Sequence, residues 1–430
     1  IAHRLDLPIE EVRQRNLYRT EGDRVTTHYG QAIDADALAE VWNRGVAVSE
    51  LAERRRQIEA GNATNPSFKR GIGVVPVKLG VGDTRSDRNQ ATAVVQVMID
   101  GSVTIHLGVA SAGTGITDRV RGQVSDLLGL PADRIHAFCG NLDAVPHSTV
   151  GHAVDATGLM TQAVAVACQD LKKRLRSVAS QLLAASGGGE IEDDAISFSE
   201  GKLWAGPRSV PLAQVVESAW RRRVSLIAVG HHRTPKLWWD AEVGGGWPFE
   251  YYALGMAVAE VQLDAFTGEI QILRVDLALD LGGSRLSALD IAQATRAFQM
   301  GAGWQLSESL RHDGDGAIMN ASSESYLPPG FADAALDFRL HDTDPSARVQ
   351  VDGQRFGTAV ESPVILAVAV REAVREAIRS FGAGKDVEDE LSVPATPEAV
   401  LGALRDLSRR VAEANRQAAQ AQAQSGAPNT

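Results

Sequence analysis

The sequence of 430 residues has few cysteines, few aromatic residues and no long apolar run. Its two cysteines, Cys139 and Cys168, form no CxxC motif and sit in apolar stretches. Buried free thiols are therefore favoured over a disulfide or an iron–sulfur ligand set. No apolar stretch approaches the roughly 20 residues of a membrane span, and no charged and then apolar leader opens the chain. We therefore predict a cytoplasmic protein that does not enter a membrane.

Long basic runs are also missing. The net charge is -11, and the basic clusters 172–174 and 221–223 are short. The first lies on a helical pattern, where a solvated face is the simpler interpretation, so nucleic acid is not an expected partner. In contrast, 44% of the residues are hydrophobic, which is enough to bury a large core, and the length suggests two or three domains.

Periodic apolar patterns predict both strands and helices. Alternation around Asp100-Gly101, and again over 258–275 with Gly268 in the turn, predicts two β-hairpins. Helical spacing predicts helices over the ranges 39–58, 116–128, 161–183, 291–306 and 362–382. This alternation of hairpins and helices predicts an α+β fold in which antiparallel sheets pack on helices, in two subdomains.

The expected domain organisation has four parts. They are connecting helices at 1–70, a first subdomain at 71–240, a second subdomain at 241–400, and a helical, low-complexity tail at 401–430. The chain opens with Ile1 in place of Met, and its first helical stripe has no start signal. We therefore expect that a longer protein was cut or split here, or that a partner chain supplies what precedes.

Glu361 is the most informative candidate for catalysis. It stands directly before Ser362, a good N-cap, and Pro363, which suits the first helical position. The positive end of the following helix would favour a charged carboxylate. A glutamate just outside a helix start is also common in simple capping, so the local sequence leaves both roles open.

Three other segments are weaker candidates. Gly113-Thr114-Gly115 lies between a predicted strand and a predicted helix, where it could cradle a phosphate, although a plain tight turn is the simpler interpretation. His147 and His152 do not lie on one helical face and have no third ligand nearby, which argues against a metal site. Gln293 and Gln299 are amides on or near an apolar helix and say little alone.

Several short motifs occur in a fixed order along the chain. They are Lys69-Arg70-Gly71-Ile72-Gly73, Asn89-Gln90-Ala91, Asp100-Gly101-Ser102-Val103, Pro248-Phe249, Tyr251-Tyr252, Ala292-Gln293, Ala297-Phe298-Gln299 and Glu361. Together they resemble the molybdenum-binding large subunit of the xanthine dehydrogenase/aldehyde oxidase family, over about residues 1–382. The opening residues resemble the middle of that subunit, so the chain is similar to its C-terminal half.

The resemblance implies a molybdenum-dependent oxidoreductase, a hydroxylase that oxidises an aldehyde or a nitrogen heterocycle. In this family a pyranopterin, as molybdopterin or its cytosine dinucleotide, holds the molybdenum through its dithiolene, so no protein metal ligands are expected. A glutamate, here Glu361, is the base for attack by the Mo–OH oxygen. Electrons leave through [2Fe–2S] clusters to FAD. The implied partners are an iron–sulfur chain, an FAD chain and a chain carrying the N-terminal half.

The resemblance also assigns the remaining site residues. The implied cofactor contacts are Gly113, Thr114, Gly115, Ser148, Thr149, Gly151, His152, Ala153, Gln293 and Val360. The implied substrate-facing residues are Asp83, Thr84 and His152.

Four positions depart from the family pattern. Thr114 stands where the family usually has Gln, Val360 where it has Gly, and His152 where it has Ala. Asp83 corresponds to an aromatic that packs on flat substrates, so purine stacking is not expected. Two hypotheses remain open: one half of a split molybdenum hydroxylase, or a degenerate, non-catalytic structural subunit of such a complex.

Overall fold

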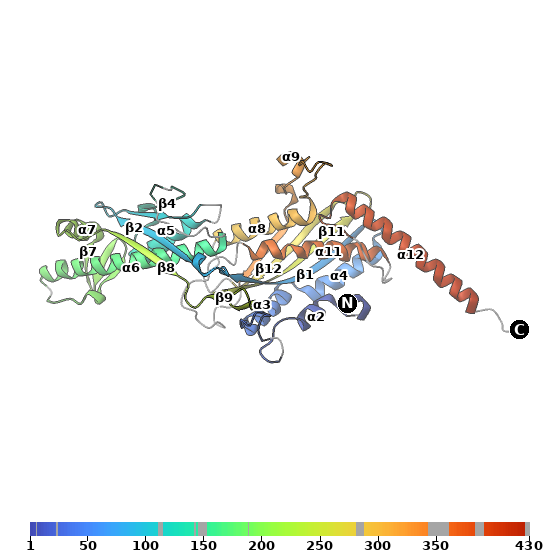
Figure 1. Ribbon diagram of the computed structural model, residues 1–430, viewed down its shortest axis with the longest axis horizontal. Coiled ribbons are helices and arrows are strands. Elements are labelled where there is room, and N and C mark those ends of the chain that lie inside the picture. Colours follow the sequence, from blue (N-terminus) through green and yellow to red (C-terminus); the bar gives the residue numbers. More distant parts are fainter. Residues whose placement is uncertain are drawn as a thin grey trace.

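The molecule has two lobes arranged along its long axis (Figure 1). The computed structural model describes residues 1–5, 7–22, 25–110, 115–141, 143–144, 153–187, 189–280, 288–342, 361–382 and 391–425. Residues 90–233 form the first lobe, and the second lobe is built from the segments before and after it. None of the helices in the described ranges is long and apolar enough to cross a membrane.

A four-stranded sheet in the order β1-β11-β12-β13 is the centre of the second lobe. Its strands are β1 (Phe68–Val81), β11 (Tyr251–Asp264), β12 (Ile270–Leu279) and β13 (Asp337–Asp342). All neighbours are antiparallel except β12 and β13, which are parallel. β11 and β12 confirm the predicted second hairpin, and Gly268 takes a φ of +76° in its turn, a conformation that glycine adopts without strain.

Helices cover both faces of this sheet. One face packs on α3 (Ala35–Val48) and α4 (Leu51–Thr64), and the other on α8 (Ala288–Leu306), α10 (Ser362–Leu366) and α11 (Val368–Arg379). The helix predicted over 39–58 is therefore two helices, because Glu50 turns into the left-handed region with a φ of +54°. The helix predicted over 362–382 is likewise divided, at Ala367.

The first lobe packs two helices on one face of a second sheet, ordered β4-β3-β2-β8. These elements are β2 (Gln90–Val97), β3 (Val103–Leu107), β4 (Ile135–Cys139), β8 (Ile227–Arg233), α5 (Ile116–Leu128) and α6 (Ala153–Ala185). The β2–β3 hairpin and the helix over 116–128 confirm the predictions. Alternate residues such as Val95 and Ile105 are fully buried, which explains the period of two in the sequence.

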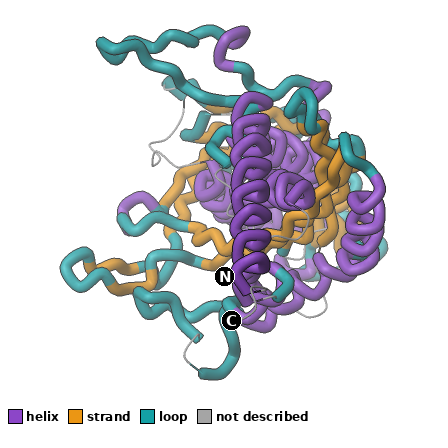
Figure 2. Tube along the Cα trace, turned by 90° about the vertical axis from the view of Figure 1, so that its right-hand side faces the viewer, coloured by secondary structure: helices purple, strands orange, loops and turns teal. Residues whose placement is uncertain are grey.

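Smaller elements complete the two lobes. They are α1 (Ala2–Leu5), α2 (Ile9–Arg15), β5 (Ser197–Ser199), β6 (Lys202–Ala205), β7 (Arg208–Pro211), α7 (Leu212–Arg221), β9 (Trp238–Asp240), β10 (Gly245–Trp247), α9 (Ser323–Tyr326) and α12 (Pro397–Ser425). The start of α12 buries Val400 and Leu407 on the second lobe, and its later turns run away from the body (Figures 1 and 2). The α+β fold with antiparallel sheets packed on helices is thus confirmed, with a parallel pair at one edge of each large sheet.

The first lobe is an insertion between two paired strands. β1 and β11 are hydrogen-bonded from Phe68 opposite Asp264 to Val81 opposite Tyr251, and the chain between them leaves for the first lobe and returns. The expected boundary at residue 71 therefore falls inside β1, a strand of the second lobe. Because strand pairing joins residues far apart in the chain, the local apolar pattern does not reveal the partner of β1.

Strand glycines let helices contact the sheets through their backbones. A Cβ atom at Gly71 would lie 1.9 Å from the carbonyl oxygen of Ala373 in α11, and one at Gly73 would lie 2.0 Å from that of Ala369. In the first lobe, a Cβ atom at Gly230 would lie 2.0 Å from the carbonyl oxygen of Ala163 in α6. Each lobe thus brings a helix against its sheet at a distance that only glycine allows.

A buried charge network ties α4 to the sheet of the second lobe. Arg54 donates from Nε to Glu260 at 2.9 Å and from Nη1 to Asp276 at 2.9 Å. Asp276 also accepts a hydrogen bond from Arg274 Nε at 2.8 Å and lies 3.2 Å from His341 Nε2. Burial alone would raise the pKa of Asp276, but these hydrogen bonds and the two guanidinium charges lower it below its ordinary value.

We expect the Asp276→Asn variant to lose stability in a pH-dependent way. A carboxylate whose native pKa is lowered stabilises the fold above its unfolded-state pKa of about 4, and this stabilisation is lost as the pH falls through the native pKa. The unfolding free energy at pH 7 should therefore fall by about 2 kcal/mol, and the difference from wild type should shrink below about pH 4. Urea unfolding at several pH values measures both. Asp337→Asn, which removes an exposed pair with Arg339, is the control and should change little. An equal loss at pH 3 and pH 7 would contradict this explanation.

Candidate active site at the lobe junction

Glu361 lies at the entrance of α10. Ser362 and Pro363 are the first two helical residues, so the capping position belongs to Glu361 and not to Ser362 as predicted. The Glu361 carbonyl accepts the Val364 N–H at 3.1 Å. Its half-buried side chain makes no capping hydrogen bond to α10 within the described part of the chain. Simple capping therefore does not explain the carboxylate.

The neighbouring residue has an unusual hydroxyl. Ser362 is fully buried, and its Oγ atom has no hydrogen-bond partner among the residues that the structure describes. Buried polar groups nearly always have a partner, and the exceptions need an explanation such as a missing ligand. A polar ligand beside Glu361 would satisfy this hydroxyl.

Gly115 and Gln293 meet across the two lobes. Gly115 precedes α5 with a φ of +67°, and Gln293 is a buried residue of α8. A Cβ atom at Gly115 would lie 2.9 Å from Nε2 of Gln293, so the amide lies directly against the backbone. Two residues that the resemblance assigned to the cofactor, far apart in the chain, are therefore neighbours in the structure.

α8 links this pair to the helix that follows Glu361. The helix carries Gln293 in its first half and packs on α10 in its second half, where a Cβ atom at Gly301 would lie 2.3 Å from the carbonyl oxygen of Val364. In Figure 1, α8 begins on the side of the second lobe that faces the first lobe. The start of α5 thus contacts the first half of α8, and α10, which follows Glu361, contacts its second half.

Most other expected cofactor contacts lie outside the described residues. These are Gly113, Thr114, Ser148, Thr149, Gly151, His152 and Val360. Ala153 is the first residue of α6. The roles of all eight residues stay predictions.

Asp83 and Thr84 lie in the turn after β1. Asp83 accepts the Arg85 N–H at 2.8 Å and a hydrogen bond from Arg88 Nη1 at 3.2 Å, and its own N–H donates to Asn89 at 2.8 Å. Thr84 is exposed. The Asp83 carboxylate therefore shapes its own turn, and the substrate-facing roles of both residues stay predictions.

Sequence reasoning missed an ion pair at the junction. Arg119 of α5 donates to Asp290 of α8 at 2.6 Å, and both side chains are largely buried. The local sequence gives no sign of this pair, because its residues lie on helices of different lobes. Gln299, in contrast, donates to the carbonyl of Gly330 at 3.2 Å and holds a loop.

In the described ranges, the cysteines and the possible metal ligands indicate no redox or metal site besides the candidate site. Both cysteines are free, and burial raises the pKa of the Cys168 thiol to about 12, which keeps it protonated and unreactive. Cys139 is only half-buried, because β4 is an edge strand. Within the described ranges there is no cluster of three histidine, cysteine, aspartate or glutamate residues that could hold a metal ion.

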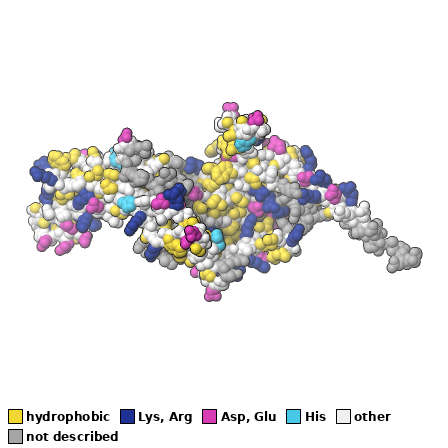
Figure 3. Space-filling model, viewed as in Figure 1, with side chains coloured by type: hydrophobic (Ala, Val, Ile, Leu, Met, Phe, Trp, Pro, Cys, Tyr) yellow, Lys and Arg dark blue, Asp and Glu magenta, His cyan; other side chains and the backbone are white. Residues whose placement is uncertain are grey.

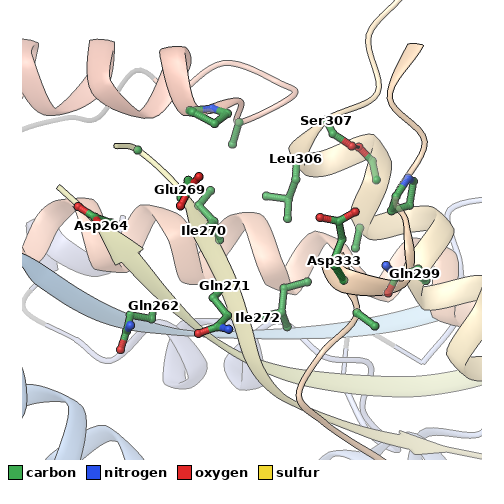
Figure 4. Close-up of a pocket in the computed structure, with 18 of the residues that line it drawn as sticks. Gln262, Asp264, Glu269, Ile270, Gln271, Ile272, Gln299, Leu306, Ser307 and Asp333 are labelled. Atoms are coloured by element: carbon green, nitrogen blue, oxygen red, sulfur yellow. Dashed lines mark hydrogen bonds between the residues drawn. The ribbon is translucent and has the colours of Figure 1, made fainter. Parts of the chain in front are cut away.

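A cavity of about 520 Å³ opens at the other end of α8 (Figure 4). Its lining includes Gln262 and Gln271 from the β11–β12 hairpin, and Leu306 and Ser307 from the end of α8. Of the candidates that the sequence suggested, Gln299 lines it, and none of the cofactor or substrate contacts implied by the resemblance does. The candidate site therefore rests on the lobe junction and not on this cavity.

The chain is similar to known proteins over most of its length. Residues 44–335 match the family model described as molybdopterin cofactor-binding domain. The chain is 32% identical to xanthine dehydrogenase/oxidase from Rattus norvegicus over 413 residues, covering 94% of this chain and 29% of the relative. It is also 32% identical to aldehyde oxidase 1 from Cavia porcellus over 409 residues, covering 94% and 28%. The chain thus spans less than a third of the length of these relatives.

A solved structure shows the same fold. CO dehydrogenase from Oligotropha carboxidovorans is similar with a TM-score of 0.76 at 16% identity, over 95% of this chain and 50% of that chain. At this identity the likeness is one of fold.

Proposed function

Because the chain belongs to the family of molybdopterin cofactor-binding domains, we propose that it is the C-terminal half of the large subunit of a molybdenum hydroxylase. Its substrate would be an aldehyde or a nitrogen heterocycle. The observation that carries the proposal is the position of Glu361, a half-buried carboxylate that does not cap its helix and stands beside the buried hydroxyl of Ser362, which has no hydrogen-bond partner among the described residues.

Three groups described above fit a polar cofactor. Gly115 leaves room for close backbone approach, Gln293 offers amide N–H donors, and Ser362 offers a hydroxyl that lacks a partner among the described residues. These three groups would hold the pyranopterin, together with the contacts expected at 113–114, 148–153 and 360. When bound, the molybdenum-pyranopterin supplies the oxygen that is transferred and takes up two electrons. The pterin would be molybdopterin or its cytosine dinucleotide.

Glu361 would act as the general base. The Glu361 carboxylate lies at the N-terminal end of α10 and makes no capping hydrogen bond to that helix within the described residues. It can therefore accept a proton while the substrate carbon gains oxygen. The partial burial of Glu361 limits the contact of its carboxylate with bulk water and strengthens the electrostatic interactions of that carboxylate.

Exposed apolar side chains support the proposal that this chain binds partner proteins. The segment that projects between α8 and β13 carries Leu310, Met319, Leu327 and Phe331, with exposed fractions from 56% to 100% (top of Figure 3). Surfaces of this kind are typical of protein interfaces. The proposed partners are a chain with the N-terminal half of the large subunit, an FAD chain and a [2Fe–2S] chain, all in the cytoplasm.

The test is the metal content of the complex purified with its partner chains. We expect about one molybdenum and one pterin per copy of this chain, measured by mass spectrometry of the metal and by fluorescence of the released, oxidised pterin. A complex that assembles without molybdenum would overturn the proposal. It would favour the alternative, a non-catalytic structural subunit, which the departures at Thr114, Val360 and Asp83 from the family pattern also favour.

A further inference from the structure

Arg119 connects the two lobes at the point where the expected cofactor contacts meet. Its side chain is 14% exposed, and the Asp290 side chain is 9% exposed. α5 belongs to the core of the first lobe through Val120 and Val124, and α8 belongs to a core of the second lobe through Phe298. The ion pair is therefore a buried contact between two separately packed units.

The same guanidinium nitrogen contacts the amide of Gln293. Arg119 Nη2 lies 2.6 Å from Oδ1 of Asp290 and 3.3 Å from Oε1 of Gln293. An arginine side chain has donors and no acceptor, so the Gln293 oxygen must face it and the amide nitrogen must point away. The nitrogen then lies on the Gly115 side, as the 2.9 Å approach shows. Arg119 thus decides which end of the amide is presented toward the start of α5.

We infer that Arg119 is a positioning residue for the cofactor. It holds the oxygen of Gln293 on its own side, so that the amide N–H donors of Gln293 face Gly115. Without the Arg119 donor, the orientation with the Gln293 oxygen toward α5 loses one hydrogen bond, and the site should lose part of its affinity for a ligand that accepts hydrogen bonds from the amide. The inference rests on the proposed function, since the ligand is the proposed pyranopterin.

The experiment measures pterin and molybdenum per folded chain in the complex purified with its partners. We expect the Arg119→Met variant to retain about a tenth of the wild-type pterin, because a hydrogen bond from a charged group is lost. Arg119→Lys should recover much of this loss, since it keeps a charged donor. Arg121→Met is the matched control on the same helix, because Arg121 donates to the carbonyls of Ile135 and Ala132 within its own lobe. It should retain pterin as wild type does.

Two further variants separate positioning from structural support. Gln293→Glu keeps an oxygen toward Arg119 and removes the N–H donors, so it should fold with an unchanged Tm and lose pterin. A double variant, Arg119→Met with Gln293→Met, should retain no less pterin than Gln293→Met alone, because Arg119 acts through Gln293.

The outcomes distinguish this inference from the proposed function. Wild-type pterin content in Arg119→Met with only a lower Tm, or additive losses in the double variant, would overturn the positioning role and leave the proposed function intact. A wild-type complex without pterin would overturn the proposed function itself.

Discussion

Replacing Glu361 with Gln is expected to lower kcat about a thousandfold while the molybdenum content and Tm of the complex stay unchanged. The amide has the size of the carboxylate and cannot accept a proton at neutral pH. General-base catalysis contributes roughly 10²- to 10⁴-fold to enzymatic rates, so its removal should appear almost entirely in kcat. Steady-state kinetics with an aldehyde or nitrogen-heterocycle substrate, together with metal analysis of the same sample, measures this effect.

The control for this variant is Glu324→Gln. Glu324 is an exposed acidic residue in the first turn of another helix, α9. It shares the helix-start position of Glu361 and lies outside the proposed site, so kcat should stay at the wild-type value. If Glu361→Gln keeps its activity with full molybdenum, Glu361 is not the base.

Replacing Gly73 with Ala is expected to lower the unfolding free energy by more than about 3 kcal/mol. The added Cβ atom would lie 2.0 Å from the Ala369 carbonyl oxygen and 2.7 Å from the Ala373 nitrogen. Both are backbone atoms of α11, so no side-chain rotation relieves the collision, and the helix must move off the sheet. Overpacking of a close-packed core costs about 1 to 3 kcal/mol even where side chains can adjust. Because α11 follows α10, the shift should also reach Glu361 and reduce activity.

Gly61→Ala makes the same chemical change at an open position. Gly61 lies in α4, and a Cβ atom there would have nothing within 4 Å. Alanine is a better helix former than glycine, so stability should stay the same or rise by up to about 1 kcal/mol. The urea midpoints of the Gly73→Ala and Gly61→Ala variants measure this difference in stability. Similar values for both would show that β1 and α11 are not in backbone contact.

Local elements of the fold could be predicted from the sequence, and long-range pairings could not. Turn residues and period-two alternation correctly indicate the hairpins at Asp100-Gly101 and Gly268, and the helix 116–128 has the predicted bounds. The break at Glu50 was missed, because a glutamate with a positive φ has no sequence signature. The pairing of β1 with β11 depends on contacts across the inserted lobe, which no local pattern records.

Some residues of the candidate site could also be predicted from the sequence, and others could not. Glu361 could be singled out because helix-start signals surround it, and Gln293 and Gly115 because they lie in segments that resemble the family. Arg119 and Asp290 carry no such sign, since an Arg within a helix and an Asp in a first turn are common on solvated surfaces. Only the packing of α5 against α8 shows that their charges meet.

The insertion of the first lobe has a mechanical consequence. Only the segments 82–89 and 234–250 carry the chain between the lobes, and they are held to each other where the Thr234 N–H donates to the Asn89 carbonyl at 3.0 Å. These two segments are the covalent links between the lobes, and the α5–α8 junction is a non-covalent contact between them. A ligand that binds Gly115 and Gln293 together would hold the two lobes in one relative orientation. Amide hydrogen exchange should then slow in both lobes when the ligand binds, and not only in the residues it touches.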